Sequence, residues 1–178
     1  MRTRGVLYSV VCGAGPAEHV DRLITQARTR GWNVQVIATA TARQHFVDVP
    51  ALERLLGEPV RTHYQVAGDR RPPADAVIVA PATYNTINKW AAGISDTYVL
   101  SVLAELTGLR LPIVVVPFVN TALAANRVFT RSLAELRAAG VIVLYGPETV
   151  EPHPPRTAET RIGSYPWHLA LDALEAIE

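Results

Sequence analysis

Apolar residues occur in short unbroken runs, and between these runs the apolar positions recur at helical spacing. Residues 6–12 form the first run, and the turn sequence Gly13-Ala14-Gly15-Pro16 follows it. Beyond the turn, four apolar residues lie on one helical face before Gly31: Val20, Leu23, Ile24 and Ala27. The chain is therefore predicted to begin with a strand, a glycine turn and a helix.

The same reading predicts the remaining elements. Further strands are expected at residues 33–38, 59–64, 74–80, 111–116 and 141–145. Helices are expected at residues 50–56, 85–92, 96–106 and 121–139, and loop chemistry at residues 65–73. The runs at 74–80 and 111–116 are apolar throughout, which is typical of parallel strands covered on both faces.

Strands that alternate with helices predict an α/β fold, a three-layer, doubly wound parallel sheet. With 178 residues, 49% of them hydrophobic, the chain fits a single domain over residues 1–178. Residues 146–166 are rich in proline and poor in apolar residues, which predicts an extended tail or flap. Residues 167–177 are predicted to form a closing helix.

Charge and cysteine content narrow the function classes. Seventeen basic residues against 16 acidic ones give no strong field for a nucleic acid or a membrane surface, so neither partner is expected. The single cysteine, Cys12, is predicted to be a buried core residue, and the first apolar run is too short for a signal peptide. We therefore expect a cytoplasmic protein. Histidine spacing predicts no metal site.

Ligands of such sheets bind beyond the carboxyl ends of the strands. The first such loop, residues 13–16, offers free amides to an anion. The second offers the hydroxyls of Thr39 and Thr41 with Arg43, which suit a phosphate, and it lacks the acidic residue that a nicotinamide dehydrogenase would need for the ribose. Ordinary tight turns and a helix cap would explain the same residues.

The loop after residues 74–80 is more informative. Residues 80–90 carry a dense run of amides and hydroxyls that a protein core does not need, and a helix cap accounts for only part of them. Such a cluster favours a flat, polar, largely uncharged partner. Asn120, in the next loop, adds another amide.

Residues 80–105, APATYNTINKWAAGISDTYVLSVLAE, resemble the flavin-binding motif of a known flavoprotein family. This family contains phosphopantothenoylcysteine decarboxylase and the peptidyl-cysteine decarboxylases of lantibiotic biosynthesis. The resemblance spans roughly residues 5–145. Residues 11–14 correspond to the family's first phosphate loop, residues 39–46 to its second, and residues 117–120 to its substrate-binding Pro-x-Met-Asn motif.

The resemblance implies that FMN is the cofactor. The positions that it assigns to FMN are Gly13, Ala14, Thr39, Thr41, Phe46, Pro81, Ala82, Thr83, Asn85, Thr86 and Lys89. It also implies a homotrimer with the flavin at the subunit boundary, or a dodecamer, in which Asn88, Lys89 and Asp96 shape the interface and the site. Lys89, the only lysine, could instead form an ordinary surface ion pair.

The resemblance further implies oxidative decarboxylation of a small-molecule or peptide substrate that ends in a cysteine-like carboxylate, with His63 and Asn120 as catalytic residues. Val119 replaces the family's methionine, and no cysteine follows Cys12, so the phosphopantothenoylcysteine reaction is not expected. A non-catalytic FMN-binding subunit that regulates or binds another protein is the alternative. A flavin prenyltransferase is disfavoured because the phosphate loops lack that branch's serine pattern.

Overall fold

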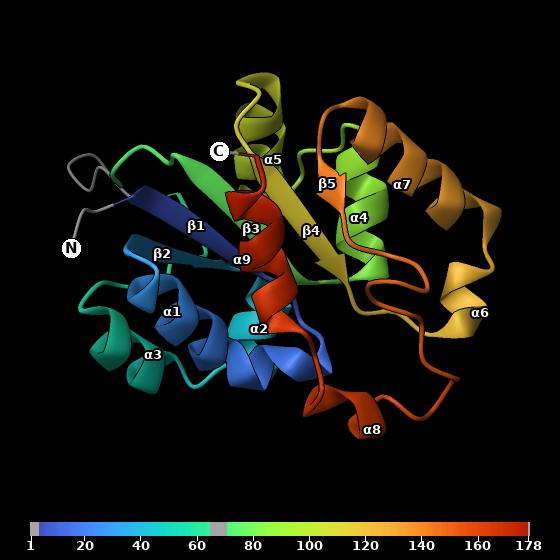
Figure 1. The fold of residues 1–178 in the computed structure, drawn as a ribbon, viewed down its shortest axis with the longest axis horizontal. Helices are drawn as coiled ribbons and strands as arrows, with labels where there is room; N and C mark the ends of the chain where they lie inside the picture. The colour runs from blue at the N-terminus through green and yellow to red at the C-terminus, as the bar shows by residue number, and fades with distance from the viewer. Residues whose placement is uncertain (1–3, 65–70, 178) are drawn as a thin grey trace.

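The computed structural model describes residues 4–64 and 71–177, which form one parallel sheet with helices on both faces (Figure 1). The strand order is β2-β1-β3-β4-β5, and every neighbouring pair is parallel. The strands are β1 (Gly5–Val11), β2 (Trp32–Ala38), β3 (Ala76–Ala82), β4 (Ile113–Pro117) and β5 (Ile142–Val143). The predicted three-layer, doubly wound α/β fold is confirmed.

Two groups of helices cover the sheet, one on each face. One core cluster joins the sheet to η1 (Gly15–His19), α1 (Val20–Thr29), α2 (Ala40–His45), α3 (Val49–Leu56) and α9 (Trp167–Glu175). The other joins it to α4 (Tyr84–Ala91), α5 (Tyr98–Gly108) and α7 (Arg127–Ala138). The remaining helices of the described residues are short, namely α6 (Thr121–Ala124) and α8 (Glu159–Ile162). No helix in the described ranges is long and apolar enough to cross a bilayer.

The central strands explain why apolar runs without alternation predict this sheet. In β3, Ile78 and Ala80 belong to the first cluster, whereas Val77 and Val79 belong to the second. Successive side chains of a strand point to opposite faces, and here both faces are buried. Apolar residues are therefore favoured at every position of such a strand, although the buried Ser9 of β1 shows that a small polar residue is tolerated.

The predicted strand at residues 59–64 is wrong. Within this segment Arg61 makes an isolated bridge to Ile37, in which the amide of Ala38 donates to the Arg61 carbonyl at 2.8 Å. The segment runs beside the outer edge of β2 but pairs at one residue. Polar residues 62–64 follow the bridge, and they lack the apolar alternation that would extend the pairing.

The single helix predicted at residues 121–139 is also wrong, because the structure divides it into α6 and α7. The side chain of Asn126 accepts a hydrogen bond from the amide of Val128 at 3.0 Å and caps the start of α7. Asparagine favours this position because its short side chain satisfies an amide that the helix leaves unpaired. The apolar spacing on both sides of Asn126 concealed the break.

Other differences are smaller. Helix α2 was not predicted, α5 begins at Tyr98 rather than at residue 96, and β5 is shorter than the predicted strand. The closing helix is confirmed as α9. Most of the predicted loop, residues 65–70, lies outside the described residues.

Candidate functional site

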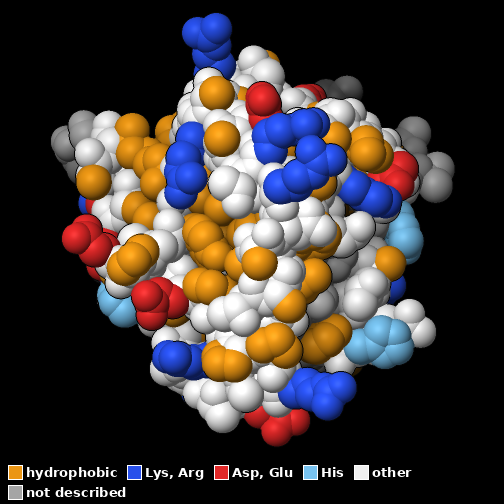
Figure 2. Space-filling model, turned by 90° about the vertical axis from the view of Figure 1, so that its right-hand side faces the viewer, with side chains coloured by type: hydrophobic (Ala, Val, Ile, Leu, Met, Phe, Trp, Pro, Cys, Tyr) orange, Lys and Arg blue, Asp and Glu red, His pale blue; other side chains and the backbone are white. Residues whose placement is uncertain are grey.

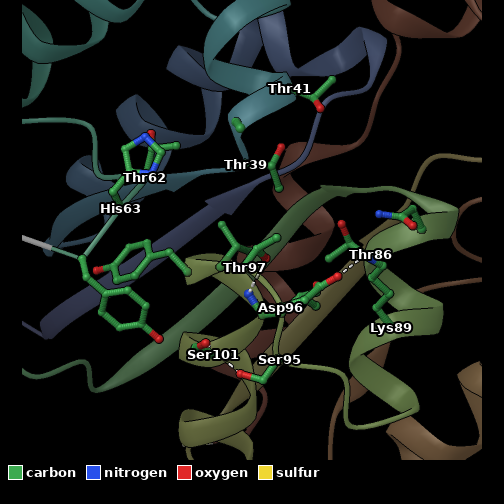
Figure 3. Close-up of a pocket in the computed structure, with 16 residues that line it drawn as sticks. Thr39, Thr41, Thr62, His63, Thr86, Lys89, Ser95, Asp96, Thr97 and Ser101 are labelled. Atoms are coloured by element: carbon green, nitrogen blue, oxygen red, sulfur yellow. Dashed lines mark hydrogen bonds and ion pairs between the residues drawn. The ribbon is translucent and has the colours of Figure 1, made fainter.

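A cavity of about 720 Å³ lies at the carboxyl ends of the strands (Figure 3). The chain reverses its direction of travel across the sheet between β1 and β3, and ligands of open α/β sheets bind at this kind of switch point. Its lining residues are Thr39, Ala40, Thr41, Thr62, His63, Tyr64, Asn85, Thr86, Lys89, Ser95, Asp96, Thr97, Tyr98, Val99, Leu100 and Ser101.

The second loop is fixed by Thr39. Its amide donates to the carbonyl of Val11 at 2.9 Å, and its hydroxyl caps α2 by accepting from the amide of Ala42 at 3.2 Å. Thr41 follows on the first turn and touches the first loop. A Cβ atom at Gly13 would lie 2.7 Å from the methyl carbon of Thr41, so the two loops can meet because residue 13 is glycine.

The third loop follows β3, and the segments that follow β1 and β4 donate hydrogen bonds to the end of this strand. The amide of Cys12 donates to the carbonyl of Pro81 at 3.1 Å, and the amide of Phe118 donates to that of Ala82 at 2.9 Å. Thr83 then caps α4, because its hydroxyl accepts from the amide of Thr86 at 3.3 Å. Capping of α4 therefore explains why a threonine stands at position 83.

Cys12 directly follows β1 and is fully buried, as predicted. Burial raises the pKa of its thiol, and hydrogen bonds with Thr86 and Thr83 offset only part of that effect. A thiol with a raised pKa is a poor nucleophile at neutral pH. Cys12 therefore supports the floor of the loop and is not a reactive group.

Lys89 pairs with Asp96, and both residues line the cavity. The Lys89 Nζ atom lies 2.5 Å from Asp96 Oδ2, with 31% and 49% of the two side chains exposed. Figure 3 shows this pair on the opposite side of the cavity from Thr62 and His63. An exposed pair contributes little to stability. Its effect is to hold one ammonium group at the cavity wall.

His63 is exposed and lines the cavity beside Tyr64. The ring of Tyr64 stands edge-on to that of Tyr98, with centroids 5.0 Å apart, and Arg71 Nη1 donates to the Tyr98 hydroxyl. Sequence reasoning missed Tyr98 and its neighbours as lining residues. Their position inside the flavin-like motif was the signal that could have found them.

Several predicted site residues lie outside the cavity lining. Asn120 caps α6, with its Oδ1 accepting from the amide of Leu123 at 2.9 Å, and Phe46 packs against the core. The structure thus brings His63 to the same cavity as five of the predicted flavin residues, but it does not bring Asn120 there. The six predicted positions that do not line it are Gly13, Ala14, Phe46, Pro81, Ala82 and Thr83. Their roles stay predictions.

The cavity has the properties that a flavin needs. Its volume falls within the range of about 300–1,000 Å³ that is typical of cofactor sites, and hydroxyls and an amide line it. The buried Oγ1 atom of Thr62, a lining residue, has no hydrogen-bond partner among residues 4–64 and 71–177, and neither has Oδ1 of Asn88, the residue before Lys89 in the chain. Buried polar atoms normally have one. Among residues 4–64 and 71–177, no three His, Cys, Asp or Glu side chains are grouped to hold a metal ion.

The fold and the cavity together define a ligand-binding protein of the Rossmann-like class. The Flavoprotein family profile matches residues 6–164, and the chain belongs to this family. Among curated relatives, the coenzyme A biosynthesis bifunctional protein CoaBC of Mycobacterium bovis is 34% identical over 131 residues, which cover 70% of this chain and 30% of that protein. The matched regions span 24% of one CoaBC relative and 30% of another.

Two solved structures cover most of this chain. The FMN-dependent cysteine decarboxylase TvaF, from thioviridamide biosynthesis, is 26% identical with a TM-score of 0.68, over 96% of this chain and 98% of that one. The FMN-dependent cysteine decarboxylase SpaF is 25% identical with a TM-score of 0.65, over 86% and 87% of the two chains.

Proposed function

We propose that this chain is an FMN-dependent enzyme that oxidatively decarboxylates a small-molecule or peptide substrate with a cysteine-like carboxylate. The observation that carries the proposal is the convergence of His63 with five predicted flavin residues on one cavity: Thr39, Thr41, Asn85, Thr86 and Lys89. The likeness to TvaF and SpaF supports both the cofactor and the reaction. The buried thiol of Cys12 fits a reducing, cytoplasmic setting.

The cavity residues suit the parts of FMN. Thr39 and Thr41, beside the backbone of Gly13, would hold its phosphate through hydroxyl and amide donors. Asn85 and Thr86 would contact its ring and ribityl chain. When bound, FMN would supply a two-electron acceptor for oxidation of the substrate thiol.

Two residues supply the remaining chemistry. The exposed imidazole of His63, at the cavity wall, would accept the thiol proton of the substrate, since histidine exchanges protons near neutral pH. In Asn120 the side-chain carbonyl is occupied by the amide of Leu123, which leaves the NH2 group free to donate to a substrate carboxylate.

Self-association into a trimer or dodecamer would let a second copy present its Asn120 to the cavity. The face that carries α6 and α7 offers a surface for this contact. Figure 2 shows hydrophobic side chains gathered across that face, with basic side chains around them. Leu123 and Val128 on these helices are 39% and 43% exposed. Exposed apolar groups of this kind mark association surfaces.

One observation favours a non-catalytic FMN-binding subunit as the second candidate. Val119 stands where the family's substrate motif has methionine, and it is 4% exposed and packed in the core. Its side chain therefore cannot contact a substrate in this arrangement. A subunit that regulates or binds another protein would keep the flavin cavity without this contact.

The test identifies the bound cofactor, measures the native mass and measures turnover. The purified protein should be yellow, release FMN on heating and show the native mass of a trimer or dodecamer. It should release carbon dioxide from peptides that end in cysteine, and His63→Asn should lower the rate at least about 100-fold because a proton acceptor is lost. Asn120→Asp keeps the helix cap but removes the NH2 donor, so it should also lose activity.

His45→Asn is the matched control, since His45 is exposed on α2 outside the cavity, and it should keep full activity. A colourless protein that takes up no added FMN would reject the cofactor. Bound FMN without turnover on any cysteine peptide would favour the regulatory subunit. Unchanged turnover in both His63→Asn and Asn120→Asp would reject the catalytic roles.

A further inference from the structure

The proline-rich residues 146–166, here called the belt, are fastened to the carboxyl edge of the sheet. The belt pairs with the loop after β4: the amide of Thr121 donates to the carbonyl of His153 at 2.8 Å. Further along, the side chain of Ile162 packs on Gly15. A Cβ atom added at Gly15 would lie 2.7 Å from Cδ1 of Ile162. The hydroxyl of Tyr165 donates to the carbonyl of Val116 at 2.7 Å. These contacts give the belt a fixed course.

A second cavity of about 220 Å³ lies between the belt and Phe118, and it shares no lining residue with the candidate flavin cavity. The rings of Phe118 and Tyr165 form an apolar wall, with centroids 5.9 Å apart. This volume is below the range of about 300–1,000 Å³ for drug-sized ligands and well above the ~30 Å³ that a water molecule takes. The cavity therefore suits a small molecule with an apolar part.

His153 presents an unpartnered polar atom at this cavity. Its side chain lines the cavity, the residue is only 6% exposed, and its ring packs on Phe118 with centroids 4.9 Å apart. The Nδ1 atom lies 2.8 Å from the Pro154 carbonyl, which can only accept, so Nδ1 carries the proton. The other ring nitrogen, Nε2, has no partner among the described residues. In this tautomer Nε2 can accept a hydrogen bond from a ligand N–H.

Two opposite charges line the same cavity. Glu151 and Arg161, both exposed residues of the belt, line it, and neither takes part in an ion pair within the described ranges. A guanidinium suits a carboxylate, and a carboxylate together with a neutral imidazole suits an ammonium group. The combination fits a ligand that carries both charges on a small frame.

We propose that this cavity is a second ligand site that binds a free α-amino acid with an apolar side chain. Arg161 receives the carboxylate, Glu151 and His153 Nε2 receive the ammonium group, and the wall of Phe118 and Tyr165 receives the side chain. The two cavities share no lining residue, and amino-acid binding can be measured whether or not the chain is a decarboxylase, although Phe118 lies in the loop at residues 117–120 that the resemblance assigns to the substrate.

The experiment is calorimetric titration of the purified protein with L-leucine, N-acetyl-L-leucine and L-leucinamide. L-leucine should bind, and each analogue should bind at least about tenfold more weakly, because each loses one charged partner. Arg161→Gln and Glu151→Gln should each raise the Kd for L-leucine about tenfold for the same reason. The difference between L-leucine and N-acetyl-L-leucine should shrink in Glu151→Gln, which lacks the carboxylate that receives the ammonium group.

Arg156→Gln and Glu148→Gln are the matched controls, since both residues lie in the belt outside the cavity lining, and they should bind L-leucine like the parent protein. The proposal is overturned if L-leucine gives no binding heat at about 10 mM. Equal binding of N-acetyl-L-leucine would also overturn it, because the site would then be a simple anion site. Equal weakening by the control variants would show an effect of net charge and not of a site.

Discussion

At Gly13 the absence of a side chain lets two loops of the candidate flavin cavity meet. A Cβ atom there would lie 2.7 Å from Thr41 Cγ2, 3.0 Å from its Cβ and 3.2 Å from the amide nitrogen of Ala42. The first neighbour is a methyl group, but the last is backbone. Packing between the loops therefore explains the glycine.

We predict that Gly13→Ala lowers the free energy of unfolding by about 1–3 kcal/mol, since the added methyl overpacks the contact with Thr41. The double variant Gly13→Ala with Thr41→Ser should recover part of this loss, because it removes the nearest carbon. Urea denaturation measures both values.

Gly163→Ala is the control for this prediction, because a Cβ at Gly163 meets nothing within 4 Å and its φ of −66° suits alanine. It should change stability by less than about 0.5 kcal/mol. An equal loss in Gly163→Ala, or no recovery in the double variant, would contradict the explanation.

Sequence reasoning found some of the polar residues of the cavity, but it missed Ser95, Thr97 and the two tyrosines. Thr39, Asn85 and Lys89 stand out because hydroxyls, amides and the single lysine follow apolar strands. Tyr98 begins α5 and reaches the cavity only through the packing of α5 against the sheet. Such a position depends on tertiary structure, which local patterns do not encode.

At the scale of elements, apolar spacing identified the strands and most helices, but side-chain caps decided where several helices begin, among them α2 and α7. Asn126 separates α6 from α7 although the spacing runs through it, and Thr39 begins α2 where no helix was predicted. Asparagine and threonine can bond to nearby backbone amides, and this competes with helix continuation. The short α2 also lacks the length that periodicity requires.

We predict that Asn126→Ala lowers the free energy of unfolding by about 0.5–2 kcal/mol, because the amide of Val128 loses its cap. Asn126→Asp keeps an acceptor oxygen at the same place and should stay within about 0.5 kcal/mol of the parent protein. Urea denaturation of both variants checks the prediction. A stable Asn126→Ala with a continuous helix at residues 121–139 would show that the cap is unnecessary.

At the scale of the whole molecule, the alternation of strands and helices predicted a parallel sheet between helical layers. It did not predict which strands lie next to one another in that sheet. The bridge at Arg61 and the course of the belt both depend on which strand lies at an edge. The belt was predicted as a tail or flap because prolines and few apolar residues indicate an extended chain. Its attachment relies on the packing of Ile162 against Gly15 and on the hydrogen bond from the Tyr165 hydroxyl to the Val116 carbonyl, and no sequence periodicity predicts either contact.

Two buried acids predict how stability depends on pH. Burial raises the pKa of Cys12 above its ordinary value of 9.0 and that of Tyr165 well above 10.0. Because the folded state favours the protonated forms, this contribution is fully present below pH 9 and is lost as the pH rises through the raised values. Urea denaturation should give a constant free energy of unfolding from pH 7 to about 8.5 and lower values above it.

Cys12→Ala separates the two acids. Its stability should be lower at neutral pH, since a buried group is lost, but it should fall less steeply between pH 9 and 10 because the thiol no longer ionises on unfolding. Equal slopes in the two proteins would mean that Cys12 ionises as easily in the folded chain as in the unfolded one.

Lys89 makes the cavity accessible to selective chemical labelling. It is the only lysine of the chain, and it lies in the cavity wall next to Asp96. Acylating or fluorescent reagents that react with lysine therefore have a single side-chain target, and that target shares its space with whatever fills the cavity. The extent of labelling at Lys89 thus measures directly how much of the cavity is occupied, and no substitution has to be introduced for this purpose.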